Sequence, residues 1–312
     1  MQSQVETGFK PAALDKHEVM RAFGRAAQHY DAYAVLQREV TSRLAERMAL
    51  FKFAPGRILD AGCGTGSGLD YLHKTYPGVP IAALDIALPM LHAAKNKMPP
   101  VSWLQKMRVQ LSRRLAERAD FLCADMEHLP CKTSSFSMLW SSLALQWASD
   151  TEACLREWHR VLQPGGLVMF ATLGPDTLKE LRRAFAEIDG GEHVSRFTDL
   201  HDIGDMLVHA GFQNPVMEME MITLTYADLK SLMVDLKGIG AHNASTDRPR
   251  GLMGKAAWQK LEAAYEEFRH AGRLPASYEV IYGHAWVGDK TRLEDGRQVI
   301  KFNIEQRKAG LR

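Results

Sequence analysis

Arg57-Ile58-Leu59-Asp60-Ala61-Gly62-Cys63-Gly64-Thr65-Gly66-Ser67-Gly68 is the stretch that decides the fold of this chain. Its apolar start predicts a short buried strand, and its glycines predict a tight turn whose backbone can approach a ligand closely. The residues that follow, 69–76, have a helical pattern. A strand, a glycine-rich turn and a helix in this order are typical of an open parallel α/β sheet, which binds ligands at the carboxyl ends of its strands.

Four more apolar runs predict further strands of the same sheet. They cover residues 81–85, 119–123, 136–141 and 166–172, and helical patterns separate most of them. Continuous apolar strands that alternate with helices indicate a parallel sheet covered by helices on both faces. We therefore expect a three-layer, Rossmann-like α/β core over residues 52–225.

The rest of the chain divides around that core. Residues 1–51 predict an N-terminal helical cover, residues 226–272 a lid of two helices around a loop, and residues 273–312 a closing strand and tail. Alternating runs at 215–225 and 278–287 predict two antiparallel strands. Together with the five parallel strands, they would make a seven-stranded sheet.

A basic insert interrupts the core at residues 99–118. It carries five basic side chains against one acid, Glu117, and its apolar residues recur at three- and four-residue spacings. This pattern predicts a basic amphipathic helix. The basic residues are Lys106, Arg108, Arg113, Arg114 and Arg118.

Composition and charge exclude several classes of protein. Of 312 residues, 46% are apolar and 24% are charged, which is typical of a globular protein. The net charge of +2 is too balanced for a surface that grips nucleic acid throughout. No apolar run reaches the ~18 residues of a membrane span, and the start lacks the layout of a signal peptide. We therefore expect a cytoplasmic protein that binds neither nucleic acid nor a membrane. Its histidines and cysteines lack the spacing of metal ligands, so we expect no metal site.

The residues around the glycine turn indicate the kind of ligand. A dinucleotide-binding turn would need a glycine at position 67 or 69, where this chain has Ser67 and Leu69. Asp60 stands directly before the turn, and its charge would repel a pyrophosphate but attract a cation. The amino group and sulfonium of S-adenosylmethionine suit such a site. The glycines that would approach this cofactor are Gly62, Gly64 and Gly66.

Side chains at the ends of the next strands support this interpretation. Asp85 ends the second strand, where a carboxylate can accept hydrogen bonds from both ribose hydroxyls. Asp125 follows the third strand and can accept from the adenine amino group, while the Met126 thioether packs on the ring. With Ser141 on the fourth strand, these residues predict a site for S-adenosylmethionine and its product S-adenosylhomocysteine.

The same segments resemble the class I, seven-stranded S-adenosylmethionine-dependent methyltransferases. That likeness covers about residues 50–225 and names the cofactor but no acceptor. It rests on Leu59-Asp60-Ala61-Gly62-Cys63-Gly64-Thr65-Gly66, Leu84-Asp85, residues 124–130 and residues 160–166.

Other segments resemble a narrower family, the malonyl-acyl carrier protein O-methyltransferases of biotin synthesis. These segments are residues 22–31, 143–147, 196–197 and 236–241. Members of that family methylate the free carboxylate of a malonyl thioester, so that fatty-acid enzymes can elongate it into a pimeloyl chain. The resemblance implies the same reaction here, with a carrier protein or coenzyme A as the thioester. Because a carboxyl pKa lies near ~4, the acceptor is already ionised and needs no general base.

The matching segments supply candidates for the acceptor site. A basic side chain would hold the malonyl carboxylate, a tyrosine hydroxyl would point at the sulfonium region, and a tryptophan would wall the malonyl channel. The catalytic candidates are Tyr30, Arg196 and Lys237, and the substrate-binding candidates are Gln146, Trp147 and Arg182. Tyr33, one helical turn after Tyr30, stays open as the relevant ring.

The basic insert suggests a docking surface for the carrier. Acyl carrier proteins are strongly acidic helical bundles, so Arg108, Arg113, Arg114 and Arg118 could bind one through charge complementarity. A solvated helix face is the alternative.

Three other functions fit the same cofactor fold. An RNA methyltransferase would exploit the basic insert, but the net charge is near zero and no added RNA-binding motif is present. A small polycarboxylate O-methyltransferase is chemically closer and would need no carrier docking. The third is a cofactor-binding assembly factor, or an enzyme that modifies arginine, as among the mitochondrial complex I assembly relatives.

Overall fold

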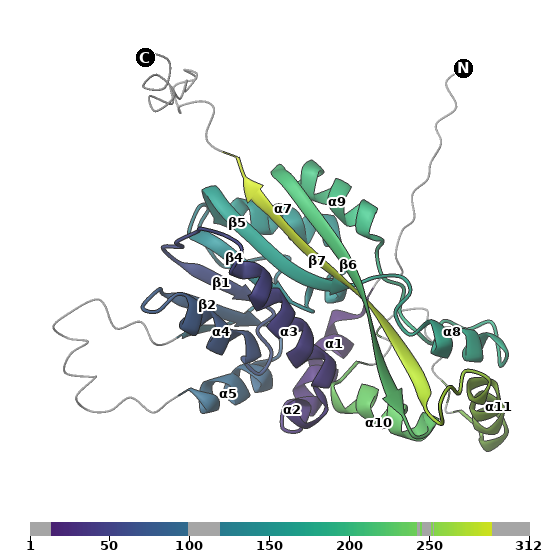
Figure 1. Cartoon of the computed structure of the whole chain (residues 1–312). Helices are drawn as coiled ribbons and strands as arrows, with labels where there is room; N and C mark the ends of the chain where they lie inside the picture. Colours follow the sequence, from purple (N-terminus) through teal and green to yellow (C-terminus); the bar gives the residue numbers. More distant parts are fainter. Residues whose placement is uncertain (1–13, 99–118, 242–243, 245–250, 252, 289–312) are drawn as a thin grey trace, which may run out of the picture.

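The computed structural model describes residues 14–98, 119–241, 244, 251 and 253–288, so the basic insert at 99–118 lies outside the described residues. Its centre is a seven-stranded sheet (Figure 1). The strands are β1 Ile58–Ala61, β2 Ile81–Asp85, β3 Ala119–Cys123, β4 Phe136–Ser142, β5 Leu162–Leu173, β6 Phe212–Tyr226 and β7 Leu274–Val287. Their order is β3-β2-β1-β4-β5-β7-β6, in which β7 is antiparallel to both neighbours and the other pairs are parallel. The predicted fold class is thereby confirmed.

Helices cover both faces of the sheet. They are α1 Lys16–Ala26, α2 Tyr30–Tyr33, α3 Val35–Met48, α4 Ser67–Thr75, α5 Leu88–Lys97, α7 Thr151–Val161, α8 Lys179–Ala186, α9 Leu200–His209, α10 Leu229–Gly238 and α11 Lys255–Glu266, with a 3-10 turn at η1 Leu145–Trp147. On one face, Val40 and Leu44 of α3 pack with the apolar residues of α4 and α5. On the other, Leu155 and Trp158 of α7 pack with α9. All four of these side chains are at most 1% exposed.

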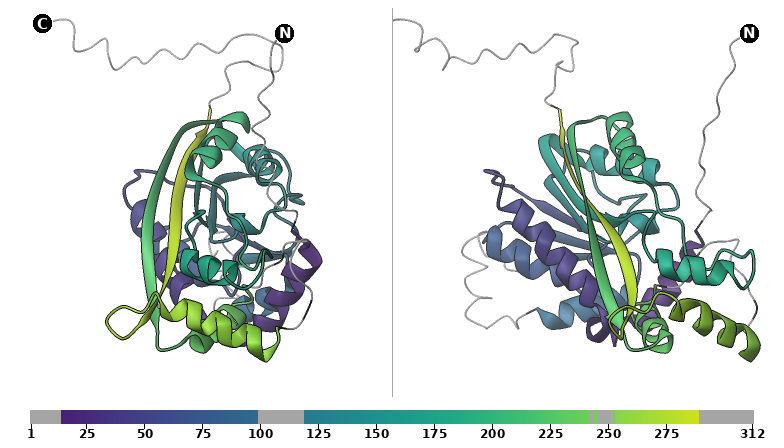
Figure 2. Two further views of the ribbon diagram at one scale, coloured as in Figure 1. Left: turned by 90° about the vertical axis from the view of Figure 1, so that its right-hand side faces the viewer. Right: turned by 45° about the vertical axis from the view of Figure 1, so that its right-hand side comes forward.

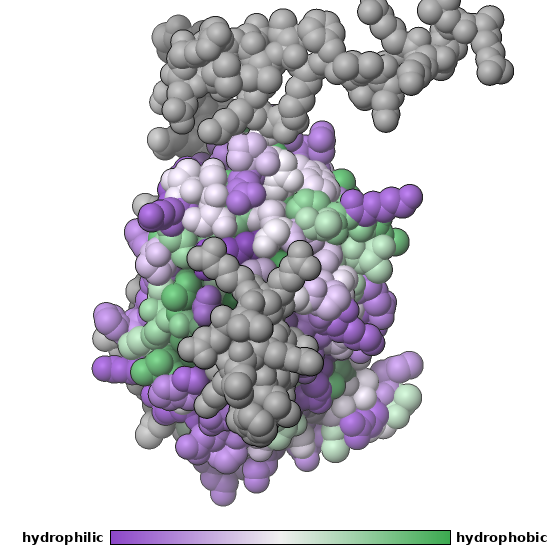
Figure 3. All heavy atoms as spheres, turned by 90° about the vertical axis from the view of Figure 1, so that its left-hand side faces the viewer, coloured by the Kyte–Doolittle hydropathy of each residue, from purple (hydrophilic) through white to green (hydrophobic). Residues whose placement is uncertain are grey.

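The long strands β6 and β7 carry the last helices away from the centre of the sheet. Figures 1 and 2 show α8, α10 and α11 gathered at one end of this pair. α10 and α11 are the two helices expected between residues 226 and 272. No helix among the described residues is long and apolar enough to cross a membrane. Figure 3 shows the side on the left of Figure 1, where the coloured part of the surface is mainly hydrophilic and hydrophobic side chains lie in separate areas.

One strand starts earlier than expected. The fifth strand was predicted over residues 166–172, but β5 already pairs with β4 at Leu162. Phe136 is opposite Leu162 and Met138 is opposite Leu167, so the residues between them bulge out of the ladder. Gly165 has a φ of 74°, which glycine adopts without strain.

Candidate active site

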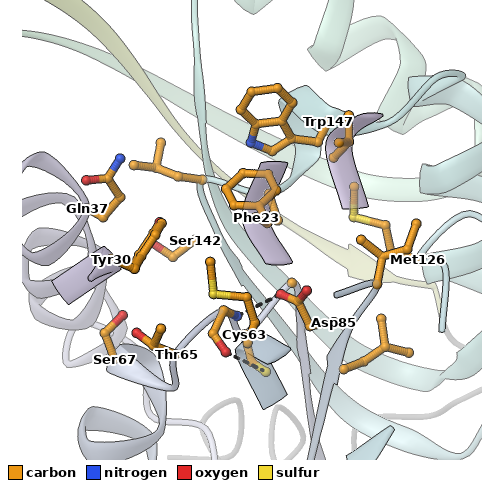
Figure 4. Close-up of a pocket in the computed structure, with 18 of the residues that line it drawn as sticks. Phe23, Tyr30, Gln37, Cys63, Thr65, Ser67, Asp85, Met126, Ser142 and Trp147 are labelled. Atoms are coloured by element: carbon orange, nitrogen blue, oxygen red, sulfur yellow. Dashed lines mark hydrogen bonds between the residues drawn. The ribbon is translucent and has the colours of Figure 1, made fainter. Parts of the chain in front are cut away.

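A cleft lies at the carboxyl ends of β1 to β4, beneath α1 and α2. Its empty volume is ≈ 830 Å³, and its walls come from the glycine turn, from the ends of β2 and β3, and from the segment after β4 (Figure 4). The N-terminal helices contribute Lys16, Val19, Phe23 and Tyr30 to the lining. The parallel sheet therefore brings Asp85, Asp125 and the glycine turn together in one cavity.

The glycine turn is held by β2 and pressed against the segment after β4. The backbone N–H groups of Gly62 and Cys63 donate to the Leu84 carbonyl oxygen at 2.8 and 2.9 Å. Gly62 has a φ of 80°, and a Cβ added there would lie 2.2 Å from the Cβ of Ala144. Both the backbone conformation and the space at this position therefore require glycine.

Asp85 anchors the turn from the end of β2. Its carboxylate accepts hydrogen bonds from the N–H groups of Gly64, at 2.9 Å, and Ala87, at 2.8 Å. Burial raises the pKa of Asp85 to about 6, and these backbone hydrogen bonds oppose that shift. A partly desolvated carboxylate at this point suits hydroxyl donors or a cation.

Asp60 is a second buried carboxylate, beneath the turn. It is 2% exposed, and its Oδ2 has no hydrogen-bond partner among the described residues. Burial, and then the negative charge of Asp85, raise the pKa of Asp60 to about 8. A cationic ligand would stabilise the ionised forms of Asp60 and Asp85 and so lower both raised pKa values, whereas a pyrophosphate would be repelled by them. The site thus fits S-adenosylmethionine better than a dinucleotide.

Asp125 and Met126 line the end of the cleft at β3. One Asp125 oxygen accepts the Glu127 N–H at 3.0 Å, and the other pairs with the Lys16 ammonium. This ion pair joins the N-terminal cover to the core. In the sequence, Lys16 is only one residue of the predicted N-terminal helical cover, so this partner of Asp125 was missed.

Three aromatic rings form the roof of the cleft. Phe23 lies edge-on to Trp147, with ring centroids 5.1 Å apart, and 6.4 Å from the ring of Tyr30. Asp31 holds α2 in place, because it accepts a 2.7 Å hydrogen bond from the Thr65 hydroxyl of the glycine turn and pairs with Lys97 at 2.5 Å. Burial, with the charges of Asp85 and Asp31, raises the pKa of Tyr30, which therefore keeps its proton.

A second cavity of ≈ 590 Å³ lies on the other side of η1. Gln146 and Arg196 line it, whereas Trp147 lines the first. The Gln146 amide donates to the Leu143 carbonyl at 2.9 Å and accepts from the Thr172 hydroxyl at 3.2 Å, so it is a fixed wall. The Arg196 side chain is 59% exposed and pairs with Glu192 at 3.2 Å.

Comparison with known proteins places this arrangement in a family. A general methyltransferase domain family matches residues 59–170. The solved structure of the YcgJ protein from Bacillus subtilis has a TM-score of 0.52 at 13% identity and covers 80% of this chain and 99% of its own, which shows the shared fold. The malonyl-acyl carrier protein O-methyltransferase of Laribacter hongkongensis is 54% identical over 293 residues, which are 93% of this chain and 96% of the relative. The chain belongs to the malonyl-acyl carrier protein O-methyltransferases.

Other members of this methyltransferase family show the same extent of similarity. The Gallionella capsiferriformans protein of that name is 51% identical over 94% of this chain and 98% of its own length. The Halorhodospira halophila protein is 44% identical over 92% of this chain and 94% of its own. The predicted family is thereby confirmed, and the methyl donor of these methyltransferases is S-adenosylmethionine, as the sequence predicted.

The methyltransferase cleft brings together only part of the predicted cofactor set. Its lining includes five of the eight predicted residues, Gly62, Gly64, Asp85, Asp125 and Met126. The other three do not line the cleft: Asp60 and Ser141 are buried, and Gly66 is half-buried. The Ser141 hydroxyl donates to the Ala61 carbonyl at 2.8 Å inside the sheet, and the next residue, Ser142, reaches the cleft instead. The alternation of a strand explains this difference of one position.

Two basic candidates are not among the described residues that line the two cavities of the methyltransferase. Arg182 donates to the carbonyls of Pro175, at 2.9 Å, Thr177, at 3.1 Å, and Ser195, at 3.5 Å, and so braces the loop after β5 from beside the second cavity. Lys237 is exposed on α10. The next residue, Gly238, packs closely against the N-terminal cover instead, since a Cβ added there would lie 2.4 Å from the Tyr33 ring.

Proposed function

We infer that this protein transfers a methyl group from S-adenosylmethionine to the free carboxylate of malonyl-acyl carrier protein, giving the malonyl methyl ester and S-adenosylhomocysteine. The observation that carries this inference is the 54% identity over 93% of the chain to a protein of that name. The acidic, cation-attracting cleft supports it. Through the resemblance to the biotin family, the ester would prime pimeloyl synthesis.

The reaction requires the protein to orient the methyl donor and the acceptor carboxylate, and it requires no proton transfer by a side chain. When bound, S-adenosylmethionine supplies a methyl group activated by its sulfonium. The acceptor carboxylate is ionised at neutral pH and needs no base, and Tyr30 keeps its proton because burial raises its pKa. We propose Tyr30 as a hydrogen-bond donor beside the reacting groups. The rings of Phe23 and Trp147 would exclude water from them.

The cofactor would be held by the acidic ends of the strands. Asp85 would accept from the ribose hydroxyls, and Asp125 would accept from the adenine amino group while Met126 packs on the ring. The cationic groups, once bound at the turn, would stabilise the ionised form of Asp60 beneath it. Backbone groups of the glycine turn would contact the methionine portion.

Arg196 is our first candidate for the negative charge of the acceptor. It shares the second cavity with Gln146, and η1 separates that cavity from the ring of Trp147 in the first. A guanidinium can bind a carboxylate through two parallel hydrogen bonds. Lys237 remains the second candidate, and Arg182, which already donates to three carbonyls, is the third.

Docking of the carrier through the basic insert is a proposal that rests on sequence alone. Arg108, Arg113, Arg114 and Arg118 lie outside the described residues. Charge reversal at Arg113 and Arg114 should raise the KM for the carrier-linked substrate and leave the KM for malonyl-coenzyme A unchanged. An unchanged KM for the carrier would refute the proposal.

Mass spectrometry of the acceptor tests the reaction. The purified protein is incubated with S-adenosylmethionine and, in parallel, with malonyl-acyl carrier protein, malonyl-coenzyme A or free malonate. We expect the carrier-linked malonyl group to gain the mass of one methyl substitution much faster than free malonate does. Equal rates on free malonate would point instead to a small-acid methyltransferase.

A further inference from the structure

Lys16 connects three segments at the β3 end of the cleft. It is the first residue of α1, it lines the cleft, and its ammonium pairs with Asp125 and, at 2.9 Å, with Glu127. Asp125 and Glu127 lie 109 and 111 positions further along the chain. A single side chain of the N-terminal cover thus bridges two carboxylates of the core.

The burial of Glu127 makes the loss of its ion pair with Lys16 energetically unfavourable. Its side chain is only 6% exposed, and its Oε1 accepts the Ser149 N–H at 2.5 Å while Oε2 faces Lys16. A buried carboxylate that loses its cation is strongly unfavourable, because neither water nor another charge replaces the partner. The position of Lys16 is therefore coupled to both the loop after β3 and the loop before α7.

Backbone contacts hold the same part of the cover. The Asp15 N–H donates to the Ala244 carbonyl at 2.9 Å, and the Ser149 hydroxyl donates to the Leu14 carbonyl at 3.4 Å. From this anchor, α1 carries Val19 and Phe23 into the lining of the cleft. The ion pair therefore sets where the roof of the cleft begins.

Asp125 can receive a ligand while it is bound to Lys16. Its Oδ1 accepts the Glu127 N–H, and its Oδ2 pairs with Lys16 Nζ and lies 4.0 Å from His128 Nδ1, whereas an ionised carboxylate offers about four acceptor positions. An amino donor from a bound nucleoside could join without displacing the ammonium. Lys16 would then fix the orientation of the carboxylate that we propose for the adenine.

We propose that Lys16 is a positioning residue that fastens the N-terminal cover across the adenine end of the cleft, so that closure of the cover and completion of the nucleoside site occur together. This inference rests on the proposed function only for the identity of the cofactor. It does not depend on which acceptor is methylated.

The test measures S-adenosylhomocysteine binding to the whole chain, by calorimetry and stopped-flow dissociation, with no acceptor present. We expect Lys16→Met to weaken binding about tenfold, within the range typical of coupled sites, mainly through faster dissociation. Lys16→Arg should restore most of the affinity. Arg21→Met is the matched control, because Arg21 lies on the same helix, has a side chain that is 64% exposed and pairs with Glu18 of that helix at 3.0 Å.

A second pair of variants separates positioning from stability. The double variant Lys16→Met/Glu127→Gln leaves no unpaired charge at position 127. In the Glu127→Gln background, Lys16→Met should change the dissociation rate of S-adenosylhomocysteine less than it does in the wild type. The double variant also remains usable should Lys16→Met alone fail to fold. The double variant should still bind more weakly than wild type. The proposal would be overturned if S-adenosylhomocysteine dissociated at the wild-type rate from both Lys16→Met and the double variant, or if these variants differed from the wild type only in melting temperature. Absence of binding to the wild type would overturn the proposed function as well.

Discussion

The ring of Phe23 stands edge-on against the indole of Trp147, with centroids 5.1 Å apart and planes at 89°. Phe23 comes from the N-terminal cover and Trp147 from the turn after β4, so this contact closes the cleft from two sides (Figure 4). Edge-to-face aromatic contacts stabilise such a closure by about 0.5–1.5 kcal/mol beyond the area they bury.

Replacing Phe23 with leucine should lower kcat/KM for S-adenosylmethionine about three- to tenfold, since apolar volume is kept but the aromatic contact is lost. Initial rates on the carrier-linked acceptor measure this effect. Phe53→Leu is the control, because Phe53 makes a similar T-shaped contact with Trp286 at 5.4 Å but does not line the cleft. Equal losses in both variants would contradict a role of Phe23 in the roof.

Gly62→Ala should destabilise the protein more than Gly64→Ala. Both positions have a positive φ, which costs a residue with a Cβ about 1–2 kcal/mol. Only at Gly62 does the Cβ also meet Ala144, at 2.2 Å, and such overlap costs about 1–3 kcal/mol more. Denaturant unfolding without cofactor measures the difference. Equal stability of the two variants would refute this account of the turn.

Asp85→Asn should weaken S-adenosylhomocysteine binding about ten- to hundredfold. A hydrogen bond to a charged group is worth about 1.5–3 kcal/mol, and an Asn side chain has one acceptor oxygen where the carboxylate has two. Calorimetric titration gives the affinity. Asp120→Asn, at an exposed position on β3, should bind as the wild type does. Unchanged affinity in Asp85→Asn would remove this residue from the cofactor site.

Asp60 should make the cofactor-free protein less stable as the pH rises. Its pKa is raised to about 8 in the folded state, so the unfolded chain loses this proton first. The contribution of Asp60 to stability is therefore complete below the unfolded pKa, near ~4, and is lost as the pH rises through the folded value. Asp60→Asn should gain stability relative to wild type across this window. Melting curves over pH test it, and parallel curves for both proteins would contradict the burial effect.

Arg196→Gln should raise the KM for the malonyl thioester and leave S-adenosylhomocysteine affinity unchanged, because Arg196 lines the second cavity rather than the first. Steady-state kinetics with both substrates varied give the two values. Arg156→Gln serves as the control, since Arg156 is an exposed residue of α7 that pairs with Glu152 at 2.8 Å. A change confined to cofactor affinity would assign Arg196 a different role.

Local patterns were sufficient to predict the parallel strands and the cleft between them. The glycine turn after β1 and the carboxylates after β2 and β3 are each visible within a few residues of sequence. A parallel sheet brings such strand ends together without further information. For this reason Asp85 and Asp125 were predicted from a single chain, and both line the cleft.

Contacts between distant segments left no comparable signal. The Lys16–Asp125 pair and the approach of Gly238 to the Tyr33 ring join helices of the cover and the lid to other elements. In its local sequence, Lys16 does not differ from an ordinary surface lysine, and Gly238 does not differ from an ordinary glycine at the end of a helix. Arg182 and Lys237 illustrate the reverse problem, because a basic side chain in a matching segment cannot show from sequence which way it points.

The most direct test of the proposed reaction follows the methyl group itself. The protein is incubated with S-adenosylmethionine that carries a labelled methyl group and with malonyl-acyl carrier protein, and the isolated carrier is then treated with mild base. We predict that the label is bound to the carrier before treatment and leaves it afterwards as methanol or monomethyl malonate, because base hydrolyses both the methyl ester and the thioester. Label that stays on the carrier polypeptide after base treatment, or no label on the carrier at all, would contradict methylation of the malonyl carboxylate.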